Sequence, residues 1–222
     1  MREVVLDTET TGLDPSDGHR VVEVACLELV NSVPTGKTYQ AYVNPSRDVP
    51  PEAEAVHGLS TAFLADKPMF GEVVDAFLAF VDDAPLVIHN AEFDLKFLNS
   101  ELRQLGRLPL DPANAVDTLA IARRKFPGAP ASLDALCRRF EIDNSHRAKH
   151  GALLDAELLA EVYLQLVGGR QPMLGLAANQ KATGPVAAKR EPRPARPHAA
   201  TDAELAAHAD FVKSLKSPIW SS

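Results

Sequence analysis

Cysteine is scarce in this chain of 222 residues, which contains only Cys26 and Cys137. Two distant cysteines in apolar segments build neither a disulfide framework nor a zinc cluster, so we expect two buried thiols and a reducing compartment. Long hydrophobic runs are also missing, since no uncharged segment approaches the ~18 residues of a membrane helix. Glu3 and Asp7 interrupt the N-terminal segment before the core of a signal peptide is complete. These absences predict a cytoplasmic protein.

Basic residues are outnumbered, with 23 Lys and Arg against 30 Asp and Glu and a formal net charge of -7. Residues 1–167 hold 15 of the basic and 26 of the acidic residues, whereas residues 168–222 hold 8 and 4. This charge balance speaks against a protein whose first part binds duplex nucleic acid through a broad basic surface. It does not exclude an enzyme that acts on nucleic acid through metal ions. The two parts are predicted to be different structural units.

The first part alternates strand-like and helix-like segments. Turn-forming residues at 10–18 join two apolar segments, which predicts a β-hairpin. Strands are expected at 3–7, 21–30, 38–43, 85–89 and 115–117, and helices around 73–81 and at 90–105, 132–140 and 151–167, with Asn90 and Ser132 as N-caps and Gly106 as a stop. Three strands followed by alternating helices and strands predict an α/β domain whose mixed sheet is flanked by helices.

The composition changes after Gly169, which predicts three regions: a domain at 1–169, a linker at 170–200 and a short helix with a tail at 201–222. The linker is rich in Pro, Ala, Lys and Arg and has few large apolar residues, which is typical of a flexible segment. Thr201 and Glu204 form a capping-box pattern at the start of the helix. Leu205, Ala209, Val212 and Leu215 then fall on one helical face, and Trp220 follows.

Asp7 and Glu9 are two apart at the end of an apolar strand, so both side chains leave the same face of the sheet and are able to grip one cation. The spacing alone is weak, because several other acidic pairs share it and a solvated pair is its usual meaning. Their position distinguishes them, since charge beside a core is costly without a cation or a donor. Both interpretations stay open on the pattern alone.

Three further residues carry a functional and a structural interpretation. Asp94 falls in the first turn of a helix, where an acid is also favoured by the helix dipole. Asp155 borders the apolar stripe of its helix and therefore needs a partner. His150 shares a site with Asp155 only if it lies on a non-helical lead-in, which Gly151 permits; otherwise it is a surface histidine among basic neighbours.

Three segments together resemble the exonuclease motifs of the DEDD superfamily, in its histidine-containing branch. They are VLDTETTG at 5–12, VIHNAEFD at 87–94 and HGALLDA at 150–156, and their order and spacing both match. The resemblance is closest to the proofreading, epsilon-type subunits of bacterial DNA polymerase III and covers about residues 2–168. It implies a ribonuclease-H-like fold with a five-stranded mixed sheet and 3′→5′ exonuclease activity on the 3′ end of single-stranded DNA.

Position by position, the resemblance implies that Asp7, Glu9, Asp94 and Asp155 are the four family carboxylates and that His150 is the general base. It also implies that Glu52 and His57 contact the terminal nucleotide together with Asp7, Glu9 and Asp155. Four converging carboxylates without a Cys or His cluster favour two Mg²⁺ or Mn²⁺ ions over zinc. The expected reaction is a two-metal hydrolysis that releases nucleoside 5′-monophosphates.

The tail is expected to bind partners. Residues 171–176 resemble the short clamp-binding motif of bacterial replication proteins, although Leu176 stands where an aromatic residue is often found. The helix after Thr201 is too short to be stable alone and presents apolar surface, so it either binds a groove on a partner or folds back on its own domain. The resemblance suggests that the partner is the polymerase catalytic (alpha) subunit. The predicted contact residues are Gln171, Met173, Leu174 and Leu176 for the clamp, and Phe211, Leu215 and Trp220 for the polymerase. The resemblance further suggests a small, theta-like accessory subunit.

Two other functions stay open at this stage. The three motifs do not indicate whether the substrate carries a 2′-hydroxyl group, so an RNA-trimming exonuclease of the same superfamily is an alternative. A binding subunit that stabilises a polymerase without catalysis is the other, and the occupation of all five catalytic positions speaks against it.

Overall fold

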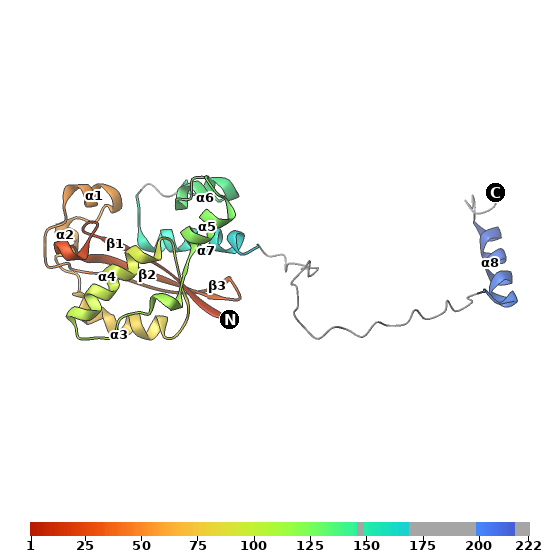
Figure 1. Cartoon of the computed structure of the whole chain (residues 1–222), viewed down its shortest axis with the longest axis horizontal. Coiled ribbons are helices and arrows are strands. Elements are labelled where there is room, and N and C mark those ends of the chain that lie inside the picture. Colours follow the sequence, from red (N-terminus) through yellow and green to blue (C-terminus); the bar gives the residue numbers. More distant parts are fainter. Residues whose placement is uncertain (146–148, 169–198, 216–222) are drawn as a thin grey trace, which may run out of the picture. The chain divides into compact units, whose positions relative to one another are not determined.

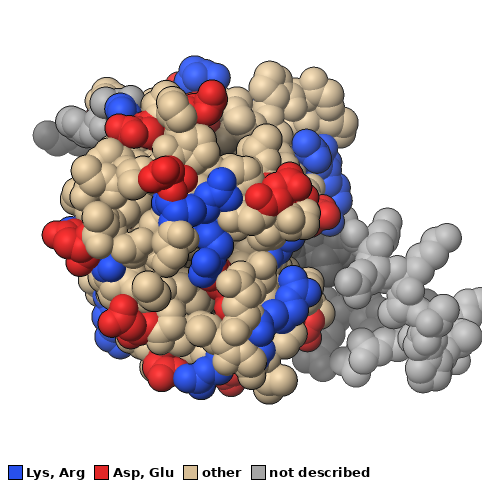
Figure 2. Space-filling view, turned by 90° about the vertical axis from the view of Figure 1, so that its left-hand side faces the viewer, with Lys and Arg blue, Asp and Glu red and all other residues tan. Residues whose placement is uncertain are grey.

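The computed structural model describes residues 1–145, 149–168 and 199–215 (Figure 1). The chain divides into two compact units, Met1–Leu174 and Gly175–Ser222, and each is described by itself. Within the described residues, no helix is long and apolar enough to cross a membrane. On the face of the first unit shown in Figure 2, Lys and Arg stand beside Asp and Glu and do not merge into one basic area.

The first unit is built on a five-stranded mixed sheet, as predicted. The strands are β1 (Arg2–Thr10), β2 (Val21–Val30), β3 (Val33–Tyr42), β4 (Leu86–Ile88) and β5 (Ala115–Asp117), in the order β3-β2-β1-β4-β5. β1, β2 and β3 pair antiparallel, which confirms the predicted hairpin. β4 lies parallel to both β1 and β5. The carboxyl ends of β1, β4 and β5 therefore meet at one edge of the sheet.

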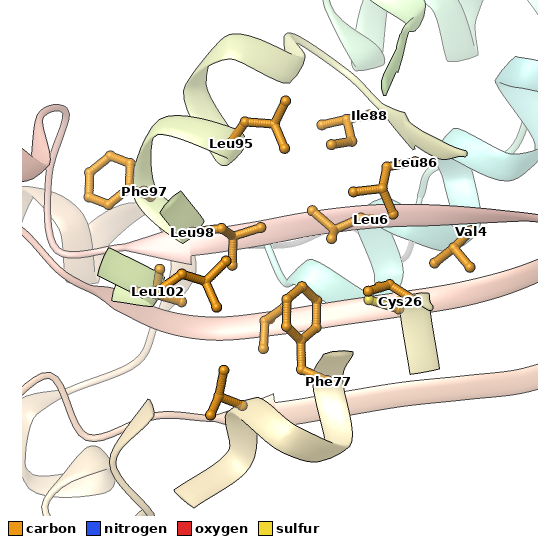
Figure 3. Packing of buried hydrophobic residues seen from close by; sticks show 14 of the residues in the cluster. Val4, Leu6, Cys26, Phe77, Leu86, Ile88, Leu95, Phe97, Leu98 and Leu102 are labelled. Carbon is orange, nitrogen blue, oxygen red and sulfur yellow. The ribbon is translucent and has the colours of Figure 1, made fainter. Parts of the chain in front are cut away.

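Helices cover both faces of this sheet (Figure 1). Those of the first unit are α1 (Pro51–His57), α2 (Thr61–Leu64), α3 (Phe70–Val81), α4 (Ala91–Gln104), α5 (Thr118–Lys125), α6 (Leu133–Phe140) and α7 (Ala152–Leu166). α3 and α4 pack on one face, where Phe77 and Leu98 meet Leu6 and Cys26 in a closed apolar core (Figure 3). α5, α6 and α7 pack on the other face against alternate residues of the same strands, among them Val5.

Two helices begin at the edge where the parallel strands end. α4 starts three residues after β4, which puts its first turn beside the end of β1. α7 runs back along β1, since the Tyr163 hydroxyl near its end donates a 2.6 Å hydrogen bond to Glu3 near the start of that strand. The first turns of both helices thus lie at the same edge, on opposite faces of the sheet.

Some local predictions need correction. Asn90 is not a side-chain N-cap: it has a left-handed backbone (φ 71°) and its amide makes no capping bond, so the helix begins at Ala91. The third strand begins at Val33 instead of residue 38, and the helices α1, α2 and α5 were not predicted. Ser132 caps its helix through the Ala135 N–H, Gly106 has φ 66° just after α4, and both cysteines are buried, as expected.

The described part of the second unit is the helix α8 (Asp202–Ser214). The predicted capping box is confirmed, because Thr201 and Glu204 exchange hydrogen bonds at its start. Leu215 lies just past the last helical residue, so the predicted apolar face is one residue shorter than expected. Phe211 is 59% exposed. The predicted contact residues at 171–176 and Trp220 lie outside the described residues, as does almost all of the predicted linker.

Candidate active site

A hollow of about 490 Å³ lies at the edge where β1 and β4 end. It brings together all five of the predicted catalytic residues. They are Asp7, Glu9, Asp94, His150 and Asp155, and the other lining residues are Thr8, His89, Phe93, Leu119, Arg123, Ser132, Leu133 and Asp134. These side chains come from β1, α4, α5, α6 and α7 and from the residues that precede α4, α6 and α7. The fold therefore collects at one place residues that lie up to 148 positions apart in the sequence.

Asp7 and Glu9 alternate with Thr8 along β1, and they point to the face on which α7 packs. Glu9 is only 8% exposed. One ligand atom from each of Glu9, His150 and Asp155 lies within 4.8 Å of the others. This separation suits three groups that share one small ligand, which supports the prediction that Glu9 and Asp155 act together.

Asp94 reaches the hollow from the opposite face of the sheet. Its carboxylate accepts two hydrogen bonds from Thr8, one from the backbone N–H at 3.1 Å and one from the hydroxyl at 2.7 Å. Burial raises the pKa of Asp94 to about 7, against the effect of the Thr8 bonds, and the charge of Asp117 adds to the rise. A buried carboxyl group in this state is stabilised as a carboxylate by a nearby cation.

His150 lies on an extended lead-in and not on the helix, as its proposed partnership with Asp155 requires. α7 begins at Ala152, and Gly151 before it has an extended backbone (φ −159°). The backbone N–H of His150 donates to the Val56 carbonyl of α1 at 3.1 Å, which fixes the lead-in. His150 Nδ1 then lies 3.4 Å from Asp155 Oδ2, with the histidine side chain 47% exposed and the aspartate 4% exposed.

Glu52 and His57 do not line this hollow but an adjoining one of about 590 Å³, which shares Thr8, Glu9 and Phe93 with it. Glu52 is exposed in the first turn of α1, and His57 is buried at the end of that helix. The Leu59 N–H donates to His57 Nδ1 at 3.0 Å, so the proton of the neutral ring sits on Nε2. That nitrogen is buried without a hydrogen-bond partner among the described residues. Burial also lowers the pKa of His57, which favours the neutral ring.

The donor set fits a hard divalent cation. The hollow contains carboxylates and imidazole groups and no thiolate among its lining residues. Carboxylate oxygens are the preferred ligands of Mg²⁺ and Mn²⁺, whereas structural zinc sites rely on Cys and His. Several carboxylates around so small a space repel one another unless cations or protons neutralise them. Asp7, Glu9, Asp94 and Asp155 are therefore able to hold divalent ions.

The sequence analysis missed several residues of the hollow. Thr8 was passed over, although strand alternation between Asp7 and Glu9 places it on the face of α4. Arg123 was missed because α5 was not predicted. A signal for that helix exists: Asp117 is its N-cap and accepts hydrogen bonds from the N–H groups of Leu119 and Ala120.

Comparison with known proteins identifies the family of this chain. The RNase_T family model, described as Exonuclease, matches residues 4–163. The DNA polymerase III subunit epsilon of Rickettsia felis is 49% identical over 225 residues, which cover 97% of this chain and 97% of that protein. The same subunit of Escherichia coli K12 is 46% identical over 219 residues, which cover 93% of this chain and 90% of the other.

Solved structures share the fold. Exonuclease X, in complex with 5′ overhanging duplex DNA, is similar with a TM-score of 0.58 and 26% identity over 74% of this chain and 90% of that one. The nuclease domain of 3′hExo, a DEDDh family member bound to rAMP, has a TM-score of 0.63 over 75% of this chain and 91% of its own; at 19% identity it supports the fold alone. The predicted ribonuclease-H-like fold is confirmed. The chain belongs to the exonuclease family and, within it, to the epsilon subunits of bacterial DNA polymerase III, and it is a 3′→5′ exonuclease.

Proposed function

We propose that this chain proofreads for a replicative DNA polymerase by hydrolysing the last phosphodiester bond at the 3′ end of a DNA strand. The observation that carries the proposal is the convergence of Asp7, Glu9, Asp94, His150 and Asp155 on one hollow. The products are nucleoside 5′-monophosphates, because the 3′ oxygen is the leaving group. The epsilon subunits among its relatives are components of DNA polymerase III by name, which supports a role beside a polymerase.

Asp7, Glu9, Asp94 and Asp155 would hold two divalent ions, Mg²⁺ or Mn²⁺. Bound ions of this kind lower the pKa of a water molecule and stabilise the negative charge of a leaving oxygen. Thr8 supports this role, since its two hydrogen bonds orient the Asp94 carboxylate toward the end of β1. The burial of Asp94 and Asp155, each 3% exposed, keeps bulk water from screening their charge.

His150 is the proposed general base. Its Nδ1 faces Asp155 Oδ2, so an Nδ1–H donates toward that carboxylate, and Nε2 is then the nitrogen whose lone pair would accept a proton from the attacking water. The exposure of the ring gives it access to a water molecule at the mouth of the hollow.

Glu52 and His57 are proposed to hold the terminal nucleotide in the adjoining hollow. The Nε2–H of His57 would offer a donor to an oxygen or nitrogen acceptor of a nucleotide that reaches into this hollow. Val56 and Phe93 supply apolar surface for a sugar or a base in the same hollow. Glu9 lies in both hollows, so the nucleotide and the bond to be cut are adjacent.

The partners are also part of the proposal. An acidic first part, with 15 basic against 26 acidic residues up to residue 167, holds DNA weakly by itself. A polymerase that delivers the 3′ end removes this difficulty. We propose that α8 with Phe211, Leu215 and Trp220 binds the polymerase catalytic (alpha) subunit, and that residues 171–176 bind the sliding clamp. A theta-like subunit is a further candidate partner.

The test uses a 5′-labelled DNA strand with a matched or mismatched 3′ end, beside an RNA strand of identical sequence. We expect Mg²⁺- or Mn²⁺-dependent release of 5′-monophosphates from DNA, faster at the mismatch and abolished by a chelator. Asp7→Asn should remove the activity and leave the thermal unfolding temperature close to that of the unmodified chain. Preferred degradation of the RNA strand supports the RNA-trimming alternative, and full activity in Asp7→Asn contradicts the assigned site.

A further inference from the structure

Glu23 is a buried carboxyl group that the proposed reaction does not use. It lies on β2, directly opposite Glu9 of β1, and is only 2% exposed. Opposite residues of an antiparallel pair have their side chains on the same face, so Glu23 lies on the face that carries α7. Burial raises the pKa of Glu23, and the nearby charge of Asp155 adds to that rise. An acid is thus costly here, and an apolar residue would fill a core position without that cost.

The contacts of Glu23 lead to the start of α7. Its Oε2 accepts a 3.1 Å hydrogen bond from the backbone N–H of Ala152, the first residue of that helix. Its Oε1 accepts a 2.7 Å hydrogen bond from the Gln40 side chain on β3. Glu23 therefore connects the first turn of α7 to the two neighbouring strands.

This contact takes the place of a missing cap. Gly151 stands at the N-cap position of α7 and has no side chain to accept from the first turn. Glu23, which is 129 positions away in the sequence, accepts one of these N–H groups instead. A carboxylate at this point also interacts favourably with the positive end of the helix dipole. The first turn of α7 is thus fixed to β2.

Two residues of the proposed reaction depend on that first turn. His150 lies two residues before Ala152, and Asp155 lies three residues after it, in the first turn itself. We propose that Glu23 is a positioning residue for the exonuclease reaction, which fixes the start of α7 and thereby holds His150 and Asp155 against Glu9. The inference rests on the proposed roles of those two residues.

Two matched variants separate position from charge. Glu23→Gln keeps the length and an acceptor oxygen for the Ala152 N–H, while Gln40 turns its amide to face the new side chain. Glu23→Asp keeps the charge but draws the acceptor back by one methylene group. If position matters, Glu23→Gln stays within about threefold of the unmodified rate, whereas Glu23→Asp loses about 10- to 100-fold in kcat, as is typical for groups that orient metal ligands. Glu28→Asp, on the same strand and away from the hollow, is the control.

The measurements are kcat and KM on a short DNA strand, the Mn²⁺ concentration for half-maximal rate, and hydrogen exchange of the Ala152 N–H in the metal-free full chain. We expect Glu23→Asp to lower kcat more than it changes KM, to raise the Mn²⁺ requirement, and to speed exchange of the Ala152 N–H; Glu28→Asp should change none of these. Equal activity in both Glu23 variants, or greater loss in Glu23→Gln, overturns the proposal. A chain without activity on DNA contradicts the proposed function instead, and unchanged Ala152 exchange in Glu23→Asp still overturns the role of Glu23.

Discussion

Thr8 shows how a single strand serves both faces of the sheet. Asp7 and Glu9 point to the face of α7, while the N–H and hydroxyl groups of Thr8 donate to Asp94 of α4 on the other face. Because side chains alternate along a strand, three consecutive residues bring both helices to one edge. Residues at the end of β1 therefore determine the relative position of carboxylates that come from opposite faces.

His150 allows a test at the same scale. It has two possible roles, because it lies near Asp155 and also belongs to a group of three side chains able to hold an ion with Glu9. If His150 is the general base, we expect His150→Ala to lower kcat about 100-fold or more and to leave the Mn²⁺ requirement little changed. The measurement is the rate on a short DNA strand across a Mn²⁺ series. Recovery of the full rate at high Mn²⁺ would show that His150 holds the ion instead.

Glu28 gives a prediction for the pH dependence of stability. Hydrogen bonds from Arg2 and Thr35, with Lys37 nearby, lower the pKa of Glu28 from 4.5 to about 2. A carboxylate whose pKa is lower in the folded chain stabilises the fold at pH values above its pKa in the unfolded chain. That contribution is lost as the pH falls from about 4.5 toward 2. Glu28→Gln should therefore have a lower Tm than the unmodified chain at pH 6, and the difference should shrink on acidification. Thermal unfolding at several pH values checks it, and a constant difference contradicts it.

At the scale of elements, the connection between β1 and β2 is fastened to α4. The Arg20 guanidinium makes two 2.6 Å hydrogen bonds to the Glu101 carboxylate, which is 3% exposed and also accepts from the Val21 N–H. At the tip of the connection, Lys96 of α4 pairs with Asp14 at 2.5 Å. This connection lines the hollow assigned to the terminal nucleotide. The two ion pairs therefore hold one wall of that hollow in place.

Removal of Glu101 tests this fastening. Glu101→Ala leaves the Arg20 guanidinium without its partner, and Arg20 is itself 27% exposed, so water recovers part of the loss. We expect the free energy of unfolding to fall by about 2 kcal/mol and KM for a DNA strand to rise more than kcat falls. Urea unfolding and steady-state kinetics measure the two effects. A loss within about 0.5 kcal/mol, the range of ordinary surface changes, would contradict the structural role of the pair.

The elements also show what the sequence was able to predict. β2 was predicted with its observed bounds, because a long apolar run lies between turn-forming residues. β3 begins five residues earlier than expected, and the added residues include Pro34 and Gly36, which an edge strand tolerates. α1 is seven residues long and carries two acids in its first turn, so it shows little apolar periodicity. The left-handed backbone of Asn90 depends on tertiary contacts, including its N–H bond to Asp117.

The candidate site was predictable in its residues but not in its arrangement. The motifs around Asp7, Asp94 and Asp155 identify the carboxylates by order and spacing. The contact of Thr8 with Asp94 and that of Glu23 with Ala152 join segments that are 86 and 129 positions apart, and no local pattern encodes them. Long-range pairing of this kind becomes visible only once the sheet order is known.

At the scale of the whole molecule, we expect the exonuclease activity and the binding of the polymerase to reside in different units of the chain. A chain that ends at residue 169 contains every residue of both hollows, so we expect it to degrade a short DNA strand at the rate of the full chain. It lacks α8 and Trp220 and should not bind the polymerase catalytic subunit. The full chain should show a change of Trp220 fluorescence when that subunit is added, and size-exclusion chromatography checks the binding. Binding by the shortened chain would place the polymerase contact on the exonuclease unit instead.

The direction of α7 has a consequence for access. This helix of 15 residues begins at the catalytic hollow and spans about 22 Å, at ~1.5 Å per residue, toward the far end of β1. Residue 168, the last described residue after this helix, therefore lies on the side of the first unit that is remote from the hollow. If the segment after residue 168 attaches this unit to a polymerase, as proposed above, a change in the length of that segment would alter how often a 3′ terminus reaches the hollow.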